Sequence, residues 1–289
     1  MITGRIIRGV GSFYDVILTD QTVIRAQARG KLRKDHLTPL VGDLAEVSPH
    51  SRGHWSIESL LPRKNLLIRP PVSNIDQMLI VLSADLPVPD FLLADKLILS
   101  CILSEIDPVL VLNKMDLSDR LLETVQIQYA SFPVIPVSAR EGWNLDRLQE
   151  ILRGKISCLS GQSAVGKSSL INSILPEIHL ETGELSEKIG RGKNTTRHAE
   201  LIPCMGGALL DTPGFSLLEF QYDPGLAQLG YPEFAAYSQF CRFRECSHVS
   251  EPDCGVRNAV SDGKIDPERY ERYTEIYREL SERRKHQYD

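Results

Sequence analysis

The first part of the chain carries short stretches in which apolar and polar residues alternate. This period of two predicts β-strands separated by turns such as Gly11-Ser12 and Thr19-Asp20. The expected strands cover residues 6–10, 13–18, 23–26, 43–47 and 54–57. Several short strands within about 65 residues are typical of a small barrel. An OB-fold is the natural candidate, and the pattern alone leaves an SH3-like barrel open.

The pattern changes after Pro70-Pro71, where continuous apolar runs begin to alternate with stretches of helical periodicity. Strands are expected over residues 77–83, 108–112, 133–137, 156–159 and 208–210, and helices over 91–103, 118–132, 145–152 and 169–175. Apolar strands that alternate with helices predict an α/β fold with a parallel sheet and helices on both faces.

From about residue 221 the pattern breaks into loops, and a last helix begins at Pro267. Its Tyr270, Tyr273, Tyr277 and Leu280 share one face, which is expected to be a packing face. We therefore expect a barrel over residues 1–68, an α/β domain over 69–220 and a C-terminal module with helices over 221–289.

Composition and charge narrow the class of protein. With 42% hydrophobic and 25% charged residues, the chain is not a wholly disordered one. Apolar runs are far shorter than the roughly 20 residues of a membrane helix, and the start lacks a signal peptide's features. A cytoplasmic protein without membrane contact is expected. The net charge of -5 argues against a globally basic nucleic-acid binder.

The charge is unevenly distributed along the chain. Residues 1–70 hold 11 Lys and Arg against 6 Asp and Glu. This local excess indicates a module that faces a polyanion, and a merely solvated basic surface is the alternative.

Residues 161–168 match the pattern of a phosphate-binding loop, with an apolar strand before it and a helix after it. Backbone amides of such a loop cradle phosphate oxygens at a helix N-terminus, whereas an ordinary glycine turn is the alternative. Lys167 would bridge the β- and γ-phosphates, and Ser168 would ligate Mg²⁺. The expected nucleotide contacts here are Gly161, Gln162, Ser163, Ala164, Val165, Gly166, Lys167, Ser168 and Ser169.

Two further segments are typical of GTPase switches. Asp211-Thr212-Pro213-Gly214 follows a strand end, where Asp211 would hold Mg²⁺ through water and the Gly214 amide would sense the γ-phosphate. Residues 190–198 have the composition of a first switch, in which Thr196, or alternatively Thr195, would coordinate Mg²⁺. A plain basic loop is the other interpretation of that segment. Lys167, Thr196, Asp211 and Gly214 are the expected catalytic residues.

A guanine site is predicted at the ends of two other strands. In Asn113-Lys114-Met115-Asp116, the Asp116 carboxylate can accept both the N1 and N2 hydrogens of guanine, which adenine lacks. Lys114 would lie along the base, and Asn113 would brace the loop. Ser138 and Ala139 belong to a motif in which the Ala139 amide would meet guanine O6.

The order of these motifs is unusual. The guanine motif and its companion precede the phosphate loop, which precedes residues 211–214, so the sheet of this GTPase is expected to be circularly permuted. The C-terminal module then follows the second switch directly and is expected to act on it.

Cys241, Cys246, His248 and Cys254 form the last candidate site. In a cytosolic chain such a cluster favours a metal over a disulfide, and three thiolates with one imidazole suit tetrahedral, structural Zn²⁺, one per chain. Unrelated cysteines are the alternative. The scattered thiols of residues 101, 158 and 204 are expected in the core.

With these residues in view, the chain resembles the RsgA (YjeQ/YloQ) family of small-ribosomal-subunit biogenesis GTPases over essentially its whole length. We expect a monomer whose hydrolysis is slow without a partner. The resemblance implies a GTP hydrolase that is stimulated by the small (30S) ribosomal subunit. It also implies contact with 16S rRNA, a late role in subunit maturation, and release on hydrolysis to GDP. The barrel residues expected to face rRNA phosphates are Arg25, Arg29, Lys31, Arg33 and Lys34.

One departure from the family pattern concerns hydrolysis. Relatives commonly carry a His immediately before the Thr pair of the first switch, where this chain has Asn194. Phe215 stands where Ras-like enzymes place a water-orienting Gln, a substitution that the family shares. His198 is a weak candidate for a general base. Two other functions stay open: a permuted GTPase of another ribosomal particle, and an RNA-binding protein that uses guanine nucleotide only as a structural ligand.

Overall fold

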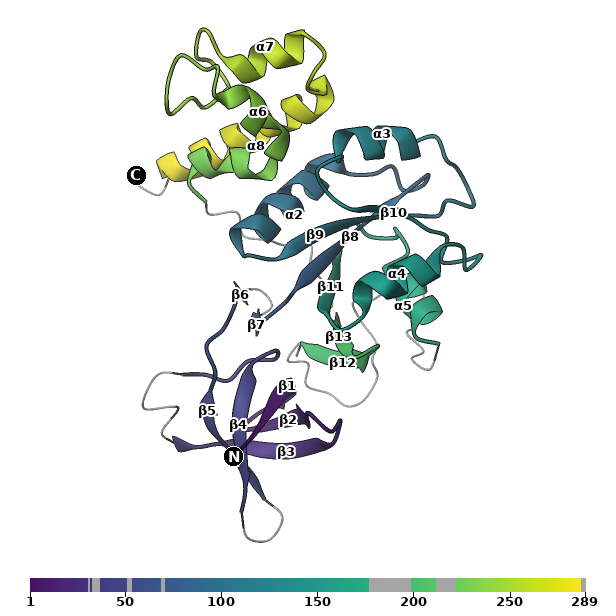
Figure 1. Cartoon of the computed structure of the whole chain (residues 1–289), viewed down its shortest axis with the longest axis vertical. Helices are drawn as coiled ribbons and strands as arrows, with labels where there is room; N and C mark the ends of the chain where they lie inside the picture. Colours follow the sequence, from purple (N-terminus) through teal and green to yellow (C-terminus); the bar gives the residue numbers. More distant parts are fainter. Residues whose placement is uncertain are drawn as a thin grey trace.

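The computed structural model describes residues 1–30, 32, 37–50, 54–68, 71–176, 199–211 and 222–286. Along this part of the chain, a barrel, a sheet flanked by helices and a helical module follow one another from one end of the molecule to the other (Figure 1). The sheet and its helices lie between the other two.

The N-terminal strands close into a barrel. They are β1 (Ile2–Val10), β2 (Phe13–Leu18), β3 (Val23–Ala28), β4 (Leu44–Pro49) and β5 (Trp55–Leu60). Their order is β1-β2-β3-β5-β4, and β4 pairs back with β1, so no edge is left open. β3 and β5 run parallel, and the other barrel pairs run antiparallel. This closed five-stranded barrel confirms the expected one, and its strand order favours the OB-fold over the SH3-like alternative.

Alternating side chains fill the barrel. In β3, Ile24 and Ala26 are buried while their neighbours point outward, as a period of two requires. Val16, Val47 and Ile57 from other strands complete this small core.

The second part is a parallel sheet. Its strands β8 (Gln77–Ser83), β9 (Asp107–Asn113), β10 (Val134–Pro136), β11 (Ile156–Ser160) and β13 (Gly207–Asp211) lie in the order β10-β9-β8-β11-β13 and pair in parallel. All residues of the central strand β8 are buried, which explains its uninterrupted apolar pattern.

Helices cover both faces of this sheet, as expected. They are α2 (Phe91–Leu103), α3 (Leu122–Gln128), α4 (Leu145–Leu152) and α5 (Lys167–Ile174). One apolar cluster packs α2 and α3 on one face, and a second packs α4 and α5 on the other (Figure 1). α2 begins where the sequence predicts, because the Asp90 carboxylate accepts the amide hydrogen of Leu93 at 2.8 Å.

Three features differ from the sequence-based expectation. α3 is shorter than the predicted helix over 118–132, and the side chain of its N-cap residue makes no capping hydrogen bond. A hairpin of β6 (Leu66–Ile68) and β7 (Pro71–Ser73) forms on either side of the predicted break. The unpredicted β12 (Glu200–Cys204) pairs antiparallel with β13 and contacts β1, so the barrel and the parallel sheet share one continuous sheet.

Over residues 222–286, the C-terminal module consists of four short helices and one long helix around an aromatic core. They are η2 (Pro224–Gly230), η3 (Pro232–Phe234), α6 (Ala235–Ser238), α7 (Gly255–Ser261) and α8 (Pro267–His286). Tyr273 and Leu280 of α8 are buried in this core, and Tyr270 and Tyr277 pack against it, which confirms the predicted packing face. Among the described residues, no helix combines the length and the apolar character that a bilayer crossing requires.

Candidate functional site

The predicted nucleotide motifs lie at one edge of the parallel sheet. The phosphate loop follows β11, the guanine motif follows β9, residues 138–140 follow β10, and Asp211 is the last residue of β13. Because the carboxyl ends of parallel strands meet at one edge, the fold brings these distant segments together.

Glycine is required at both ends of the phosphate loop. Gly161 has φ of +133°, and a Cβ there would lie 2.3 Å from the carbonyl oxygen of Val81. Gly166 has φ of +95°, and its Cβ would lie 2.4 Å from Nδ2 of Asn113. The loop can therefore pack against β8 and the guanine motif only without side chains at these positions.

Lys167 opens α5 and bends over its own loop. Its Nζ donates to the carbonyl oxygens of Gly161 at 2.8 Å and Gln162 at 2.6 Å. Burial lowers the pKa of the Lys167 ammonium, because removal from water disfavours its charged form. A phosphate anion in the loop would favour the charged form again. Ser168 and Ser169 follow it in the first turn of α5.

Asn113 joins the base motifs to the phosphate loop. Its side chain is 2% exposed, its Nδ2 donates to the carbonyl of Val165 at 2.9 Å, and its Oδ1 accepts from the Ala139 amide at 3.1 Å. One amide side chain therefore sets the spacing of three loops.

Asp116 and Lys114 also lie at this edge. The Ser138 hydroxyl donates to Oδ1 of Asp116 at 2.6 Å, while Asp116 itself is exposed. Lys114 has φ of +67°, and its Nζ donates to the carbonyl of Ala164 at 2.9 Å and to that of Leu86. Met115 differs from Lys114 and Asp116, because its side chain packs against the apolar core.

The predicted switch residues fall outside the part of the chain that the structure describes. This applies to Thr195, Thr196, Asn194 and His198 of the first switch and to Gly214 and Phe215 of the second. Of the predicted magnesium ligands, Ser168 lies within the described residues, and the backbone of Asp211 pairs with that of Glu200.

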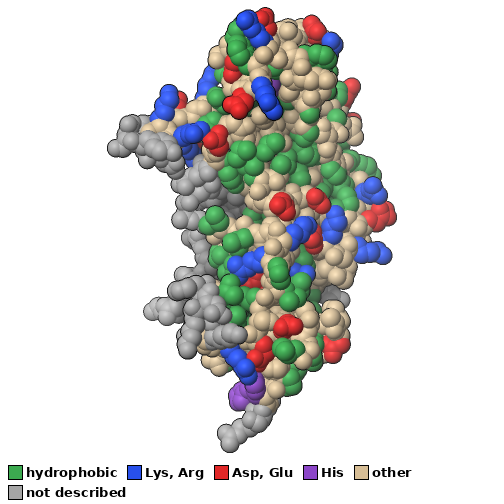
Figure 2. Space-filling model, turned by 60° about the vertical axis from the view of Figure 1, so that its left-hand side comes forward, with side chains coloured by type: hydrophobic (Ala, Val, Ile, Leu, Met, Phe, Trp, Pro, Cys, Tyr) green, Lys and Arg blue, Asp and Glu red, His purple; other side chains and the backbone are tan. Residues whose placement is uncertain are grey.

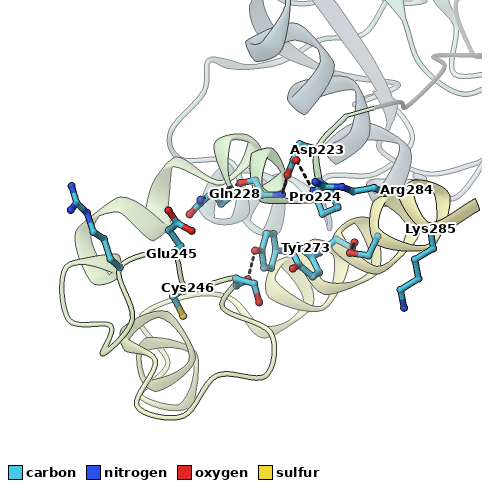
Figure 3. A pocket seen from close by; sticks show the side chains of 13 residues that line it. Asp223, Pro224, Gln228, Glu245, Cys246, Tyr273, Arg284 and Lys285 are labelled. Atoms are coloured by element: carbon cyan, nitrogen blue, oxygen red, sulfur yellow. Dashed lines mark hydrogen bonds and ion pairs between the residues drawn. The ribbon is translucent and has the colours of Figure 1, made fainter. Parts of the chain in front are cut away.

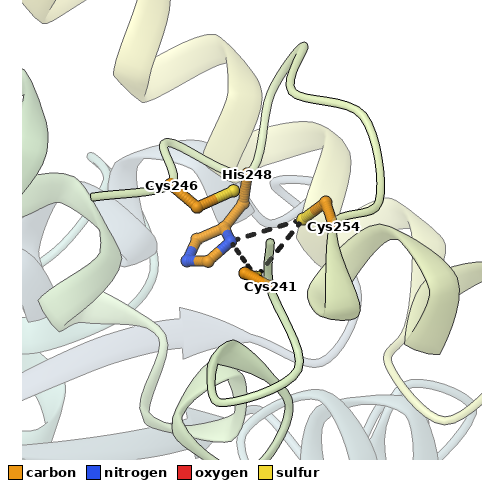
Figure 4. A group of neighbouring side chains, drawn as sticks. All are labelled: Cys241, Cys246, His248 and Cys254. Carbon is orange, nitrogen blue, oxygen red and sulfur yellow. Dashed lines mark hydrogen bonds between the residues drawn. The ribbon is translucent and has the colours of Figure 1, made fainter. Parts of the chain in front are cut away.

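The predicted metal ligands converge in the C-terminal module (Figure 4). The ligand atoms of Cys241, Cys246, His248 and Cys254 all lie within 4.8 Å of one another. Nδ1 of His248 lies 3.5 Å from Sγ of Cys241 and 3.4 Å from Sγ of Cys254, and these two sulfurs are 3.9 Å apart. Tetrahedral thiolates on one Zn²⁺ lie about 3.8 Å apart, so the set fits one metal ion, whereas a disulfide needs about 2 Å.

Residues other than the four ligands support this cluster. Oε1 of Gln228, from η2, lies 3.2 Å from Nε2 of His248, so a proton on Nε2 leaves Nδ1 free as a ligand. Although burial raises the pKa of Glu251, hydrogen bonds from the side chain and the amide of Ser247, and from the amides of Glu251 itself and Ser250, lower it to about 2. No spacing rule in the sequence identifies Gln228 or Glu251 as support for this site.

Burial favours the neutral form of two thiols in this cluster. Burial raises the pKa of the Cys246 thiol to about 12 and also raises that of Cys254, because apolar surroundings disfavour a thiolate. A bound cation reverses this preference. Two buried thiols, the half-buried thiol of Cys241 and one imidazole with Nδ1 turned toward them are a chemically suitable set for Zn²⁺.

A cavity of about 990 Å³ lies beside the metal cluster (Figure 3). It is lined by η2, the loop before Cys246 and α8, and none of the predicted nucleotide residues that the structure describes lines it. Its charged residues are of both signs, and Arg284 pairs with Asp223 at 2.7 Å. The cavity therefore has no single charge that would select a ligand.

Two of the five predicted rRNA residues lie in the described barrel. Arg25 is exposed, and its guanidinium lies 5.0 Å from the centre of the Phe13 ring. Arg29 pairs with Glu58 at 2.7 Å. Lys31, Arg33 and Lys34 lie outside the described residues. On the face shown in Figure 2, basic and acidic side chains of the described residues are interspersed.

Two family models match the barrel and the part that contains the parallel sheet. The family model described as RsgA GTPase matches residues 60–221, and the model described as RsgA N-terminal domain matches residues 3–54.

Two relatives that match almost the whole chain are both named "Small ribosomal subunit biogenesis GTPase RsgA". The protein from Caldanaerobacter subterraneus subsp. tengcongensis is 43% identical over 99% of this chain and 98% of its own. The protein from Geobacillus thermodenitrificans is 40% identical over 98% and 99%, respectively.

Two solved structures have a similar fold. "YjeQ from Thermotoga maritima" has a TM-score of 0.85 at 35% identity and covers 96% of this chain and 98% of its own. "YloQ, a circularly permuted GTPase" has a TM-score of 0.84 at 32% identity and covers 98% and 96%.

Proposed function

This chain belongs to the RsgA GTPase family, and we propose that it hydrolyses GTP while bound to the small ribosomal subunit during a late step of subunit maturation. The observation that carries this proposal is the junction made by Asn113. Its amide links the phosphate loop at Val165 to the base loop at Ala139 in the permuted order of motifs.

The residues of the nucleotide site take the following proposed roles. Asp116 selects guanine, and Lys114 and Ala139 contact the base. Residues 161–169 hold the phosphates with Lys167 on the β- and γ-phosphates, and the Gly214 amide meets the γ-phosphate. Bound Mg²⁺ would be held by Ser168, Thr196 and Asp211 and would neutralise charge on the phosphates.

Hydrolysis requires a positioned water at the γ-phosphate. Asn194 can accept a hydrogen bond from that water but cannot remove its proton at neutral pH. The hydrolytic step therefore depends on the subunit to complete the site. GTP holds the protein on the subunit, and hydrolysis to GDP and phosphate releases it.

The flanking parts have separate roles in this proposal. The barrel, over residues 1–68, contacts 16S rRNA, while residues 69–220 form the GTPase domain. The module over residues 221–289 holds one structural Zn²⁺ through three thiolates and His248. The protein acts as a monomer in the cytoplasm.

Turnover with and without purified small subunits tests the function. We expect slow hydrolysis by the protein alone and marked stimulation by small but not large subunits. Nucleotide binding without any hydrolysis would favour a structural role for GTP, and stimulation by large subunits would favour another client.

A charge variant tests the rRNA surface. Replacing Lys31, Arg33 and Lys34 with Ala should weaken subunit binding and flatten its salt dependence, while GTP binding stays unchanged. The matched control replaces three exposed arginines of the GTPase domain, Arg120, Arg147 and Arg153, with Ala. Equal effects of both variants would place the rRNA surface elsewhere.

A further inference from the structure

A turn begins at Ser83, at the end of the central strand of the sheet. Ser83 is the last residue of β8 and is 0% exposed. Its hydroxyl donates to the carbonyl oxygen of Leu86 at 2.9 Å and accepts from the Asp85 amide at 3.4 Å. A serine hydroxyl that bonds the backbone two and three residues ahead fixes the course of the chain there.

Backbone pairing fixes the position of this turn relative to the guanine motif. Ser83 lies opposite Asn113 in the parallel pair β8–β9, and the Ala84 amide donates to the carbonyl of Asn113 at 2.7 Å. The position of the turn is therefore tied to β9, the strand that leads into residues 114–116.

The carbonyl of Leu86 has a second donor. Nζ of Lys114 donates to it and also to the carbonyl of Ala164 in the phosphate loop at 2.9 Å. The ammonium is thus held between two carbonyls, one from the turn and one from the phosphate loop. The side chain of Leu86 is 65% exposed, so this residue contributes its backbone oxygen rather than packing.

We propose that Ser83 is a positioning residue of the guanine site: it fixes the Leu86 carbonyl that holds Lys114 in place for the base. This inference rests on the proposed function, which assigns Lys114 to the base. It adds a residue that belongs to none of the nucleotide motifs and that acts through Lys114 without touching the nucleotide.

Release of a fluorescent GDP analogue from the full-length protein tests this role. Ser83→Ala should release it about 3- to 10-fold faster, the usual effect of one lost hydrogen bond. Lys114→Ala should release it about 10- to 100-fold faster, because a charged group is lost. Release of GTP and of GDP should be accelerated equally, since the two nucleotides share the base and the turn lies near the base site rather than the γ-phosphate.

The double variant separates positioning from general stability. If Ser83 acts through Lys114, the variant with both substitutions should release the analogue no faster than Lys114→Ala alone. The matched control is Ser100→Ala, which removes another buried serine hydroxyl, on α2, that lies 3.4 Å from the Tyr222 hydroxyl. It should leave release unchanged. Thermal unfolding of both serine variants verifies that each is folded.

Two outcomes overturn the inference alone. They are a Ser83→Ala variant that releases nucleotide no faster than Ser100→Ala, and effects of Ser83 and Lys114 that multiply in the double variant. If Lys114→Ala itself leaves release unchanged, the assignment of the base site fails instead.

Discussion

Asp95 of α2 and Arg269 of α8 form an ion pair that is closed off from solvent. Oδ1 and Nη1 are 2.7 Å apart, and the two side chains are 0% and 1% exposed. Tyr129 donates to the same oxygen, while Tyr231 and Arg272 donate to Oδ2. The carboxylate is thus fully hydrogen-bonded where the C-terminal module meets the GTPase domain.

The arginine of this pair is enclosed by aromatic rings. Its guanidinium lies 4.5 Å from the centre of the Tyr129 ring and 4.6 Å from that of Tyr231. Burial by itself lowers the pKa of Arg269, but the carboxylates of Asp95 and Glu233 raise it, so the charge is kept.

Removal of Asp95 should strongly destabilise the protein. Asp95→Ala leaves two arginines without their buried partner, and we expect a loss of about 3–5 kcal/mol in the free energy of unfolding, measured by urea denaturation. Arg147→Ala is the control, because its pair with Glu150 is exposed and should contribute less than about 0.5 kcal/mol. Equal losses of unfolding free energy in the two variants would show that the buried pair of Asp95 and Arg269 stabilises the protein no more than an exposed pair.

One zinc ion per chain is expected in protein purified without chelator, measured by elemental mass spectrometry. Cys246→Ser should lower the metal content well below one per chain and reduce the melting temperature, because the loop around the ligands depends on the ion. Cys204→Ser is the control, since this thiol lies outside the cluster, and it should retain the metal. Wild-type protein without zinc would contradict the site.

Base selectivity should follow Asp116. In Asp116→Asn, the carboxylate that accepts two guanine hydrogens is lost, so GTP should bind about 100-fold more weakly. Xanthosine triphosphate should bind better, because its 2-oxo group accepts from the new amide. Equilibrium titrations measure both, with Asp119→Asn as a nearby exposed control. Unchanged GTP affinity would refute the assignment of the base site.

A substitution of Asn194, the residue before the Thr pair of the first switch, tests how the hydrolytic water is activated. Asn194→His restores the residue expected in relatives, and subunit-stimulated hydrolysis should then rise about 10- to 100-fold if a histidine positions or deprotonates the water. Single-turnover hydrolysis with small subunits measures this, and GTP affinity should not change. A constant rate would mean that another group, supplied by the ribosome, orients the water.

Much of the fold could be predicted from the sequence because its signals are local. The strand over 77–83 and the helices over 91–103 and 145–152 have the predicted bounds, since an unbroken apolar run and a helical stripe report burial directly. The phosphate loop and the Cys/His cluster were recognisable because each depends on residue types at fixed spacing. Gly161 and Gly166 illustrate this, because only glycine fits their backbone and neighbours.

Only the tertiary structure decided which of these local pieces meet. Nothing in the pattern around Asp95 indicates that its partners come from Tyr129, Tyr231 and residues of α8. The pairing of β12 with β1, and the Leu86 carbonyl that Ser83 and Lys114 share, depend in the same way on contacts distant in sequence. Periodicity specifies which face of an element is apolar, but the choice of partner depends on how all faces pack at once, and a buried polar group can be identified as satisfied only when that packing is complete.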